Sequence, residues 1–150
     1  SAVFWDGKLR RGAFGLISIV MRFRFVDYVV LVVEDIDRAL LFYTDSMGIT
    51  LGHRSGDYAQ LQTGQTRIGL YARRAMADLL GGRLERPHEE APAFELGFKV
   101  DDVDIEYARL TALGARAVTK PVTRAWGQRT AYVRDPDGNL IELVQDLPKV

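Results

Sequence analysis

The sequence contains an internal repeat, and this repeat constrains the fold more than any other feature. Residues 33–37 read VEDID, and residues 100–104 read VDDVD, 67 positions later. Each copy follows a short apolar run typical of a strand and leads into apolar residues at helical spacing. A chain of 150 residues is long enough for two half-domains that share one core. We therefore expect a single structural domain built from two tandem modules.

Each module is predicted to run strand, helix, strand, strand, strand. In the first module a helix begins at Ile36, and strands are expected over residues 28–33, 50–54, 58–62 and 67–72. In the second module a helix begins at Val103, and strands are expected over residues 94–100, 117–118, 129–134 and 140–144. Asp35 and Asp102 precede these helices, and we expect them to be N-caps because a short carboxylate accepts the unpaired N–H groups of the first turn.

Turn residues support the same division of the chain. Residues 135–138 read DPDG, which favours a tight turn before the last strand, and residues 62–65 (QTGQ) take the corresponding place in the first module. We divide the chain into an N-terminal extension (1–20), a first module (21–82), a linker (83–93) and a second module (94–150).

The N-terminal extension resembles a signal peptide only superficially. Basic residues precede a weakly polar run over residues 12–21, which is too short to span a bilayer. Arg22 follows this run, where a cleavage site would need small residues. We therefore expect an appended segment rather than an export signal, with Met21 as an alternative start of the chain.

The composition excludes several classes of function. The chain has no cysteine, which excludes disulfides, thiolate metal sites and cysteine nucleophiles. It has two histidines, His53 and His88, so a mechanism that needs several imidazoles is excluded. Twenty basic residues balance twenty acidic ones, which gives no overall attraction to nucleic acid or to an anionic membrane. We expect neither as a partner, and a reducing cytoplasmic location fits.

The repeat and its turns together resemble a known family. The stretches that carry the resemblance are VDYVVLVVED at 26–35, ALLFY at 39–43, FELGFKVDDVD at 94–104, WGQRTAY at 126–132 and DPDGNLIEL at 135–143. They resemble the vicinal oxygen chelate superfamily, which includes glyoxalase I, bleomycin-resistance proteins and extradiol dioxygenases. The resemblance implies an α+β fold: two tandem β-α-β-β-β modules forming a curved, trough-like mixed sheet with helices on the outside.

The resemblance also implies where a metal would be held. In that superfamily the ligands come from the first and last strands of each module, and the matching positions here are Tyr28, Gly69, Glu95 and Glu142. Gly69 has no side chain, and only Glu142 is of the usual ligand type. Because a catalytic ion usually has three protein ligands, we expect no cofactor. The alternative is a hard divalent metal held by Glu95 and Glu142 with waters.

Glu95 and Glu142 are also the candidate catalytic residues. We expect them to face each other in the trough, where two carboxylates can share a proton and act as general acid and base. The alternative is that they pair with arginines such as Arg129 and are solvated. Strand alternation places Glu142 on the trough face and its neighbours Ile141 and Leu143 beneath the helices.

Further side chains are candidate ligand-binding residues: Tyr28, His53, Tyr58, Trp126 and Arg129. Tyr58 and Trp126 lie ahead of the third strand of their modules, where they would form aromatic walls or pack in the core. His53 would contact a ligand or transfer a proton, and its alternative is a structural role.

Two functions follow from the resemblance, and both remain open at this point. The first is a bleomycin-resistance-like protein that binds a small apolar or aromatic molecule in the trough without a catalytic metal. The alternative is a lyase, isomerase or dioxygenase of the same superfamily that uses Glu95 and Glu142, with or without a metal. We expect a homodimer, because troughs in this superfamily are often completed by a second subunit.

Overall fold

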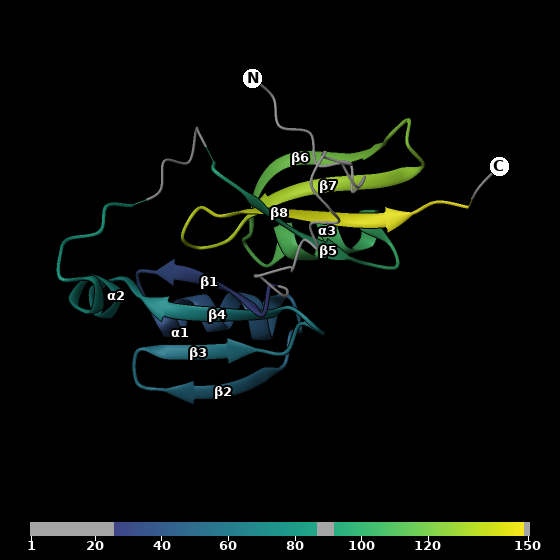
Figure 1. The fold of residues 1–150 in the computed structure, drawn as a ribbon. Helices are drawn as coiled ribbons and strands as arrows, with labels where there is room; N and C mark the ends of the chain where they lie inside the picture. Colours follow the sequence, from purple (N-terminus) through teal and green to yellow (C-terminus); the bar gives the residue numbers. More distant parts are fainter. Residues whose placement is uncertain (1–25, 87–91, 149–150) are drawn as a thin grey trace, which may run out of the picture.

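Both predicted modules are present in the computed structural model, which describes residues 26–86 and 92–148. The first contains β1 (Tyr28–Val33), α1 (Ile36–Leu40), β2 (Leu51–Ser55), β3 (Tyr58–Leu61), β4 (Arg67–Ala72) and α2 (Arg73–Leu80). The second contains β5 (Glu95–Lys99), α3 (Val103–Ala112), β6 (Arg116–Thr123), β7 (Gln128–Arg134) and β8 (Leu140–Asp146) (Figure 1). The expected N-terminal extension lies outside the described residues.

The two modules share one sheet topology. The strand orders are β1-β4-β3-β2 and β5-β8-β7-β6. In each sheet the first strand runs parallel to the last, and the other neighbours are antiparallel. The predicted α+β fold of two tandem modules is therefore confirmed, as two four-stranded mixed sheets rather than one continuous sheet. Figure 1 shows β1 and β5, one edge strand of each sheet, on the sides that turn toward the other module.

The helices begin where the sequence predicts. The Asp35 carboxylate accepts a hydrogen bond from the Arg38 N–H at 3.0 Å, and the Asp102 carboxylate accepts one from the Ile105 N–H at 2.9 Å. Both residues satisfy a donor of the first turn, which confirms the two predicted N-caps.

The first helix widens in its second half, which the sequence pattern did not predict. After α1 the chain continues as a π-helical segment, η1 (Leu41–Ser46). The Met47 N–H donates to the Phe42 carbonyl oxygen, five residues back, at 2.9 Å. The Tyr43 side chain is fully buried in the core.

The buried residues of both modules form one core beneath the helices. Leu31 and Val33 of β1 are buried in the first module, and Ile141 and Leu143 of β8 are buried in the second. This pattern confirms the predicted alternation along the last strand. We call the opposite face of each sheet, away from α1 or α3, its trough face.

Two elements differ from the predictions. Helix α2 was not predicted, because Ala72 precedes it and provides no side-chain cap to announce a helix. Strand β6 is much longer than the predicted residues 117–118, and it contains Pro121. A proline suggests a break in a strand, but β6 is an edge strand, where a missing N–H is tolerated. No helix in the described part of the chain is long and apolar enough to cross a membrane.

Candidate functional site

The two candidate acids lie side by side on the second sheet. Glu95 is on β5 and Glu142 is on the adjacent strand β8, where Glu142 pairs with Gly97. The Tyr132 hydroxyl of β7 donates a hydrogen bond to Glu142 Oε1 at 2.8 Å. The acids therefore belong to one wall of the trough rather than facing each other from opposite walls, and Tyr132 completes the group. We call Glu95, Glu142 and Tyr132 the acidic group.

The acidic group is electrostatically coupled. Desolvation, followed by the charge of Glu142, raises the pKa of Glu95. Desolvation, the hydrogen bond to Glu142 and the two carboxylate charges raise the pKa of Tyr132 to about 12. Tyr132 therefore keeps its proton in neutral solution and remains a donor to Glu142.

Each sheet has a glycine paired with a larger residue between its first and last strands. In the first sheet the glycine is on the last strand, and in the second sheet it is on the first strand. Val30 of β1 pairs with Gly69 of β4, whereas Gly97 of β5 pairs with Glu142 of β8. A Cβ atom at Gly69 would lie 2.9 Å from the Tyr58 ring, so the ring occupies the space that a side chain would need. A Cβ atom at Gly97 would lie 3.5 Å from Glu142 Oε2. The glycine therefore leaves that oxygen uncovered on this side.

The first sheet presents aromatic residues on its trough face. Tyr28 is 55% exposed, and the Arg67 guanidinium lies 5.8 Å from the centre of its ring. The Tyr58 ring is tilted against the Tyr71 ring at a centroid distance of 6.0 Å. His53 is exposed on the edge strand β2 and shares this face, because it pairs with Gln60 on β3.

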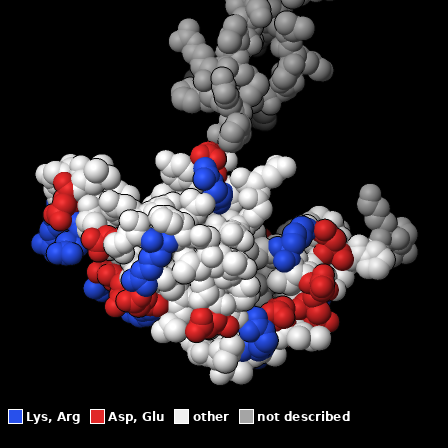
Figure 2. Space-filling view, turned by 90° about the horizontal axis from the view of Figure 1, so that it is seen from below, with Lys and Arg blue, Asp and Glu red and all other residues white. Residues whose placement is uncertain are grey.

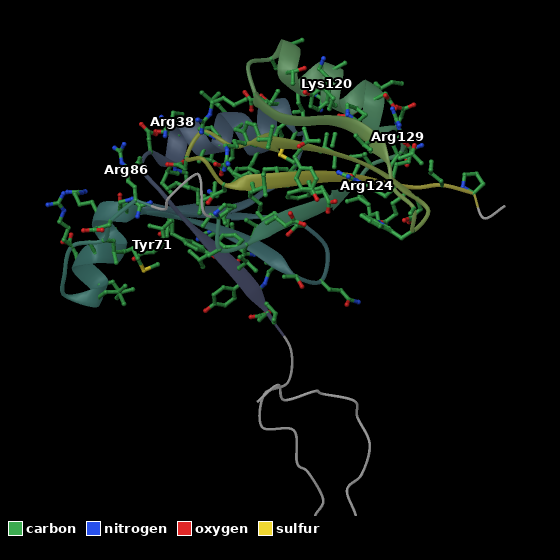
Figure 3. All side chains as sticks on the ribbon, turned by 90° about the horizontal axis from the view of Figure 1, so that it is seen from above. Arg38, Tyr71, Arg86, Lys120, Arg124 and Arg129 are labelled. Atoms are coloured by element: carbon green, nitrogen blue, oxygen red, sulfur yellow. The ribbon has the colours of Figure 1, made fainter. Side chains whose placement is uncertain are left out.

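The last two candidate ligand-binding residues, Trp126 and Arg129, lie in different surroundings. Trp126 is 69% exposed, and its indole N–H donates to the Gln128 side chain at 2.9 Å, so it does not pack in the core. Arg129 donates to Asp104 of α3 at 2.7 Å and is therefore on the helix face, close to Arg124 at one end of the module (Figure 3). The structure does not bring Arg129 to the trough face or to either acid.

The structure thus brings the candidates together in two groups. Tyr28, His53 and Tyr58 share the first sheet, while Glu95 and Glu142 share the second. Trp126 precedes Gln128, which pairs with Asp146 at the end of β8, so it lies apart from both acids along that strand. Among residues 26–86 and 92–148, no hydrogen bond or ion pair joins the two groups, and neither acid forms an ion pair. Three basic residues of the same sheet and its loops have other partners: Lys99 contacts Asp146, Arg124 donates to Thr130, and Arg134 donates to the Gly138 carbonyl oxygen.

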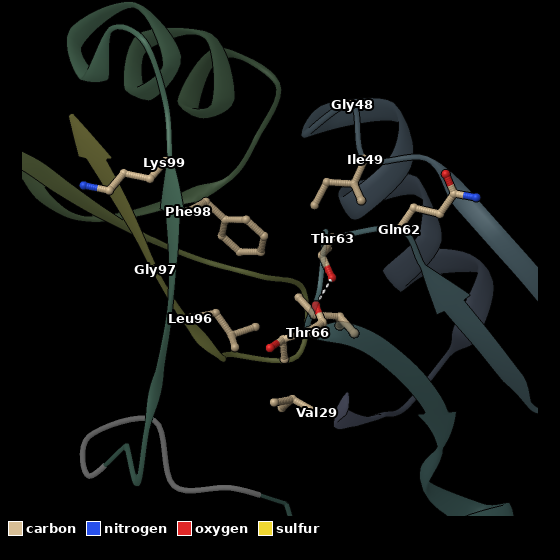
Figure 4. A pocket seen from close by; sticks show the side chains of 11 residues that line it. Val29, Gly48, Ile49, Gln62, Thr63, Thr66, Leu96, Gly97, Phe98 and Lys99 are labelled. Atoms are coloured by element: carbon tan, nitrogen blue, oxygen red, sulfur yellow. Dashed lines mark hydrogen bonds between the residues drawn. The ribbon is translucent and has the colours of Figure 1, made fainter. Parts of the chain in front are cut away.

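A cleft of about 500 Å³ lies between the modules, and β5 contributes to it Gly97, the residue that pairs with Glu142. Its apolar walls are Val29 and Ile68 of the first module and Leu96 and Phe98 of β5, with Ile49 above them. Figure 4 shows Leu96 and Phe98 pointing into this cleft from the edge of the second sheet. None of the predicted site residues lines it. The sequence gives no signal for such a cleft, because the edges of two separate sheets form it.

The charged side chains form no single-sign patch on the face shown in Figure 2. Acidic and basic residues alternate there around a broad uncharged area. A basic stripe, which would be the footprint of a nucleic-acid site, is not seen on this face.

Comparison with known proteins decides the family. Residues 25–143 match the sequence profile of the Glyoxalase/Bleomycin resistance protein/Dioxygenase superfamily. The chain belongs to this superfamily. The resemblance inferred from the repeat and the terminal hairpin is confirmed.

Individual proteins match most of the chain. The uncharacterized protein YraH of Bacillus subtilis is 38% identical over 121 residues, which cover 78% of this chain and 94% of YraH. A bleomycin resistance protein of Geobacillus stearothermophilus is 30% identical over 126 residues, covering 77% of this chain and 92% of that protein. The crystal structure of a glyoxalase-related enzyme from Fulvimarina pelagi aligns with a TM-score of 0.72 at 20% identity, covering 83% of this chain and 89% of that one. The last similarity shows the fold alone.

The residues at the superfamily's metal-ligand positions do not fit a three-ligand centre. Gly69 offers no donor atom, and the Tyr58 ring fills the space beside it. The Arg67 guanidinium lies 5.8 Å from the centre of the Tyr28 ring, and its positive charge disfavours a metal ion there. Within the described ranges no three His, Cys, Asp or Glu side chains are grouped as metal ligands would be. Only Glu95 and Glu142 are suitable donors, and binding without a metal stays a prediction.

Proposed function

We propose that this superfamily member binds a small molecule on the trough face, without a catalytic metal. The ligand we propose has an apolar or aromatic body and a protonated amine. The observation that carries this proposal is Glu142, which Tyr132 holds in place at 2.8 Å and which Gly97 leaves open. Glu95 adds a second carboxylate beside it. A protonated amine would form the ion pair that neither carboxylate forms with another described residue.

The aromatic side chains support the proposed apolar body of the ligand. Tyr58 and Tyr28 provide ring surface on the first sheet, and Trp126 provides it beside the second. Aromatic walls with a few polar anchors are typical of small-molecule sites. The relatives named bleomycin resistance proteins make bleomycin a reasonable test compound.

We propose further that a second copy of the chain completes the trough. Large apolar side chains are exposed around it, including Tyr28, Phe94 at 51% and Trp126. Exposed apolar surface of this kind marks interaction sites. Light scattering during size-exclusion chromatography measures the mass directly. A mass of one chain at every concentration tested would refute the homodimer.

Calorimetry with matched probes tests the binding proposal. We would titrate 2-phenylethylamine, 2-phenylethanol and bleomycin into the wild-type protein and into Glu142→Gln. The substitution keeps the acceptor for Tyr132 but removes the charge, so we expect at least about a tenfold loss of amine affinity. The alcohol should bind weakly and equally to both proteins.

The matched control is Glu106→Gln on α3, whose carboxylate pairs with Arg109 away from the trough. This variant should bind the amine as the wild type does. Equal amine affinity in the wild type and Glu142→Gln would refute the role of Glu142. Amine binding that requires added Mn²⁺ or Zn²⁺ would refute binding without a metal.

One observation favours an enzymatic alternative. The raised pKa of Glu95 beside Glu142 is the arrangement that a general acid and base would use. In this alternative the protein is a lyase or isomerase that transfers a proton between these carboxylates. Assays with glyoxalase-type thioesters, with and without added Mn²⁺, Ni²⁺ or Zn²⁺, test it. Turnover that is lost in both Glu95→Gln and Glu142→Gln would favour the enzyme over the binding protein.

A further inference from the structure

The turn before the last strand joins the two modules. Tyr43 of η1 donates to Asp135 Oδ2 at 2.7 Å, and both side chains are fully buried. The backbone N–H of Glu34 donates to Asp137 Oδ1 at 2.8 Å, and the Arg38 guanidinium lies 3.3 Å from the same oxygen. Each of these contacts links the first module to the second. We call Tyr43, Glu34, Arg38, Asp135 and Asp137 the closed junction.

Asp135 is fully supplied with hydrogen-bond donors. Its Oδ1 accepts from the N–H groups of Asp137 and Asn139 at 2.9 and 2.7 Å. Its Oδ2 accepts from the Asn139 side chain at 2.7 Å and from Tyr43. Four donors therefore satisfy the buried oxygens of the Asp135 carboxylate.

Asp137 lacks such a full set of donors. Its side chain is only 2% exposed, and both of its contacts across the junction use Oδ1. Oδ2 is buried and has no hydrogen-bond partner among the described residues. A buried carboxylate oxygen without a donor carries a desolvation cost while the group is charged. A proton on this carboxyl removes that charge.

We propose that Asp137 makes the closed junction sensitive to pH, so that the two modules are held together more firmly when its carboxyl is protonated. The groups that face it are Asp135 from its own turn, Glu34 from the segment between β1 and α1, and Arg38 from α1. The Glu34 carboxylate is itself paired with Arg73 of α2. The proposal concerns the fold and does not depend on the ligand proposed for the trough.

The electrostatics agree in direction with this geometry. Burial is the largest cause that raises the pKa of Asp137, and the charges of Asp135 and Glu34 raise it further. The Glu34 N–H and Arg38 oppose this shift without cancelling it. A carboxyl whose pKa is raised on folding stabilises the fold below its unfolded pKa. That stabilisation is lost as the pH rises through the folded value.

Thermal unfolding of the wild type and Asp137→Asn over about pH 4 to about pH 8 tests the proposal. Asparagine keeps an acceptor for the Glu34 N–H and carries no charge. We expect the Tm of the variant, measured relative to that of the wild type, to increase by a few degrees as the pH rises. Asp146→Asn is the control. Its carboxylate is exposed and its pKa is lowered by Lys99, so its Tm should change with pH in the opposite sense.

Nuclear magnetic resonance of the wild type provides a second measurement that needs no variant. The Asp137 carboxyl carbon should titrate above the ordinary range of aspartate, and the Glu34 amide should shift with the same midpoint. A midpoint at or below the ordinary range would overturn the proposal. A Tm difference between wild type and Asp137→Asn that does not vary with pH would overturn it as well.

Discussion

The two junctions between the modules stand at matching places in the repeat, and they differ in the polar contacts that cross them. The closed junction also borders a cleft of about 390 Å³, lined by Arg38 and Asp135, so it is distinguished by its hydrogen bonds rather than by an absence of space. In the closed junction, Tyr43 and Asp135 form a buried hydrogen bond. In the other, which we call the open junction, the corresponding positions are Leu110, which has no donor, and Gln62, which lies at the 500 Å³ cleft. The comparison teaches that a repeated backbone does not repeat its contacts, because a few polar side chains decide which contacts cross each junction.

The trough faces of the two sheets also differ because of a few side chains on the same backbone. Each pair of parallel strands contains one glycine, but its position is exchanged between the modules. In the first module Tyr58 covers the glycine, and in the second the glycine exposes Glu142. One half of the trough has therefore become aromatic and the other acidic.

The largest effect is expected from breaking the closed junction. Asp135→Ala leaves Tyr43, Asn139 and nearby N–H groups buried without their acceptor, which should lower the free energy of unfolding by about 3–5 kcal/mol. The matched variant at the open junction, Gln62→Ala, should change it by less than about 0.5 kcal/mol. Urea unfolding measures both.

A milder variant keeps this comparison testable if Asp135→Ala does not fold. Tyr43→Phe removes one donor to Asp135 and should lower the free energy of unfolding by about 1–2 kcal/mol. Equal losses for Tyr43→Phe and Gln62→Ala would show that the two junctions do not differ in energy.

The next effect concerns the exchanged glycines. Gly69→Ala places a methyl group against the Tyr58 ring and should lower the free energy of unfolding by about 1–2 kcal/mol, because the ring must move. Gly97→Ala meets only an ordinary contact with Glu142 and should be close to neutral. Thermal unfolding checks both, and a stable Gly69→Ala would mean that the Tyr58 ring is free to leave its place.

A smaller effect, of opposite sign, is expected from filling the open junction. Val29→Ile adds one methyl group at the wall of the cleft, and we expect a gain of at most about 0.8 kcal/mol in the free energy of unfolding. Val30→Ile is the control, because its side chain is on the trough face. A gain for Val30→Ile alone would contradict the position of the cleft.

The smallest effect is expected from an ion pair that is present in both modules. Asp37 and Asp104 occupy the same place in the two modules and pair with Arg54 and Arg129. These arginines donate hydrogen bonds that lower the pKa of each carboxyl. The stabilisation is therefore present above the ordinary aspartate pKa and is lost as the pH falls through the lowered one.

Asp37→Asn and Asp104→Asn should consequently lower the Tm by no more than about 2 °C near neutral pH, because both carboxylates are exposed. The difference from the wild type should be smaller at about pH 3 than near neutral pH, because the carboxyls begin to take up protons there. Scanning calorimetry at the two pH values decides this, and a loss that is undiminished in acid would point to packing rather than charge.

Much of the fold was predictable because the repeat, the caps and the DPDG turn agree with one another. The capping residues Asp35 and Asp102 predicted where both helices begin, and the turn at 135–138 predicted where the last strand begins. Helix α2 has no capping side chain, and Pro121 concealed the length of β6. Elements with a capping residue or a turn motif at their ends could therefore be predicted, whereas α2 and the full length of β6 could not.

The candidate site was predictable along a strand but not between strands. Alternation correctly placed Glu142 on the face opposite Ile141 and Leu143. Tyr132 was missed, because its contact with Glu142 depends on the register of two strands ten residues apart in the chain. Arg129 alternates in step with the buried Ala131 of β7, and this alternation places it beneath the helix.

The parallel pairing of the first strand with the last in each module has a consequence for how quickly the chain folds. The partner of β1 is β4, 39 residues later (Tyr28 to Arg67), and the partner of β5 is β8, 45 residues later (Glu95 to Leu140). The hairpins formed by the three later strands need only short loops, so they can assemble before the first strand of the module joins them. Such non-local pairing slows folding. During synthesis, the strand that emerges first from each module is therefore the last to find its neighbour.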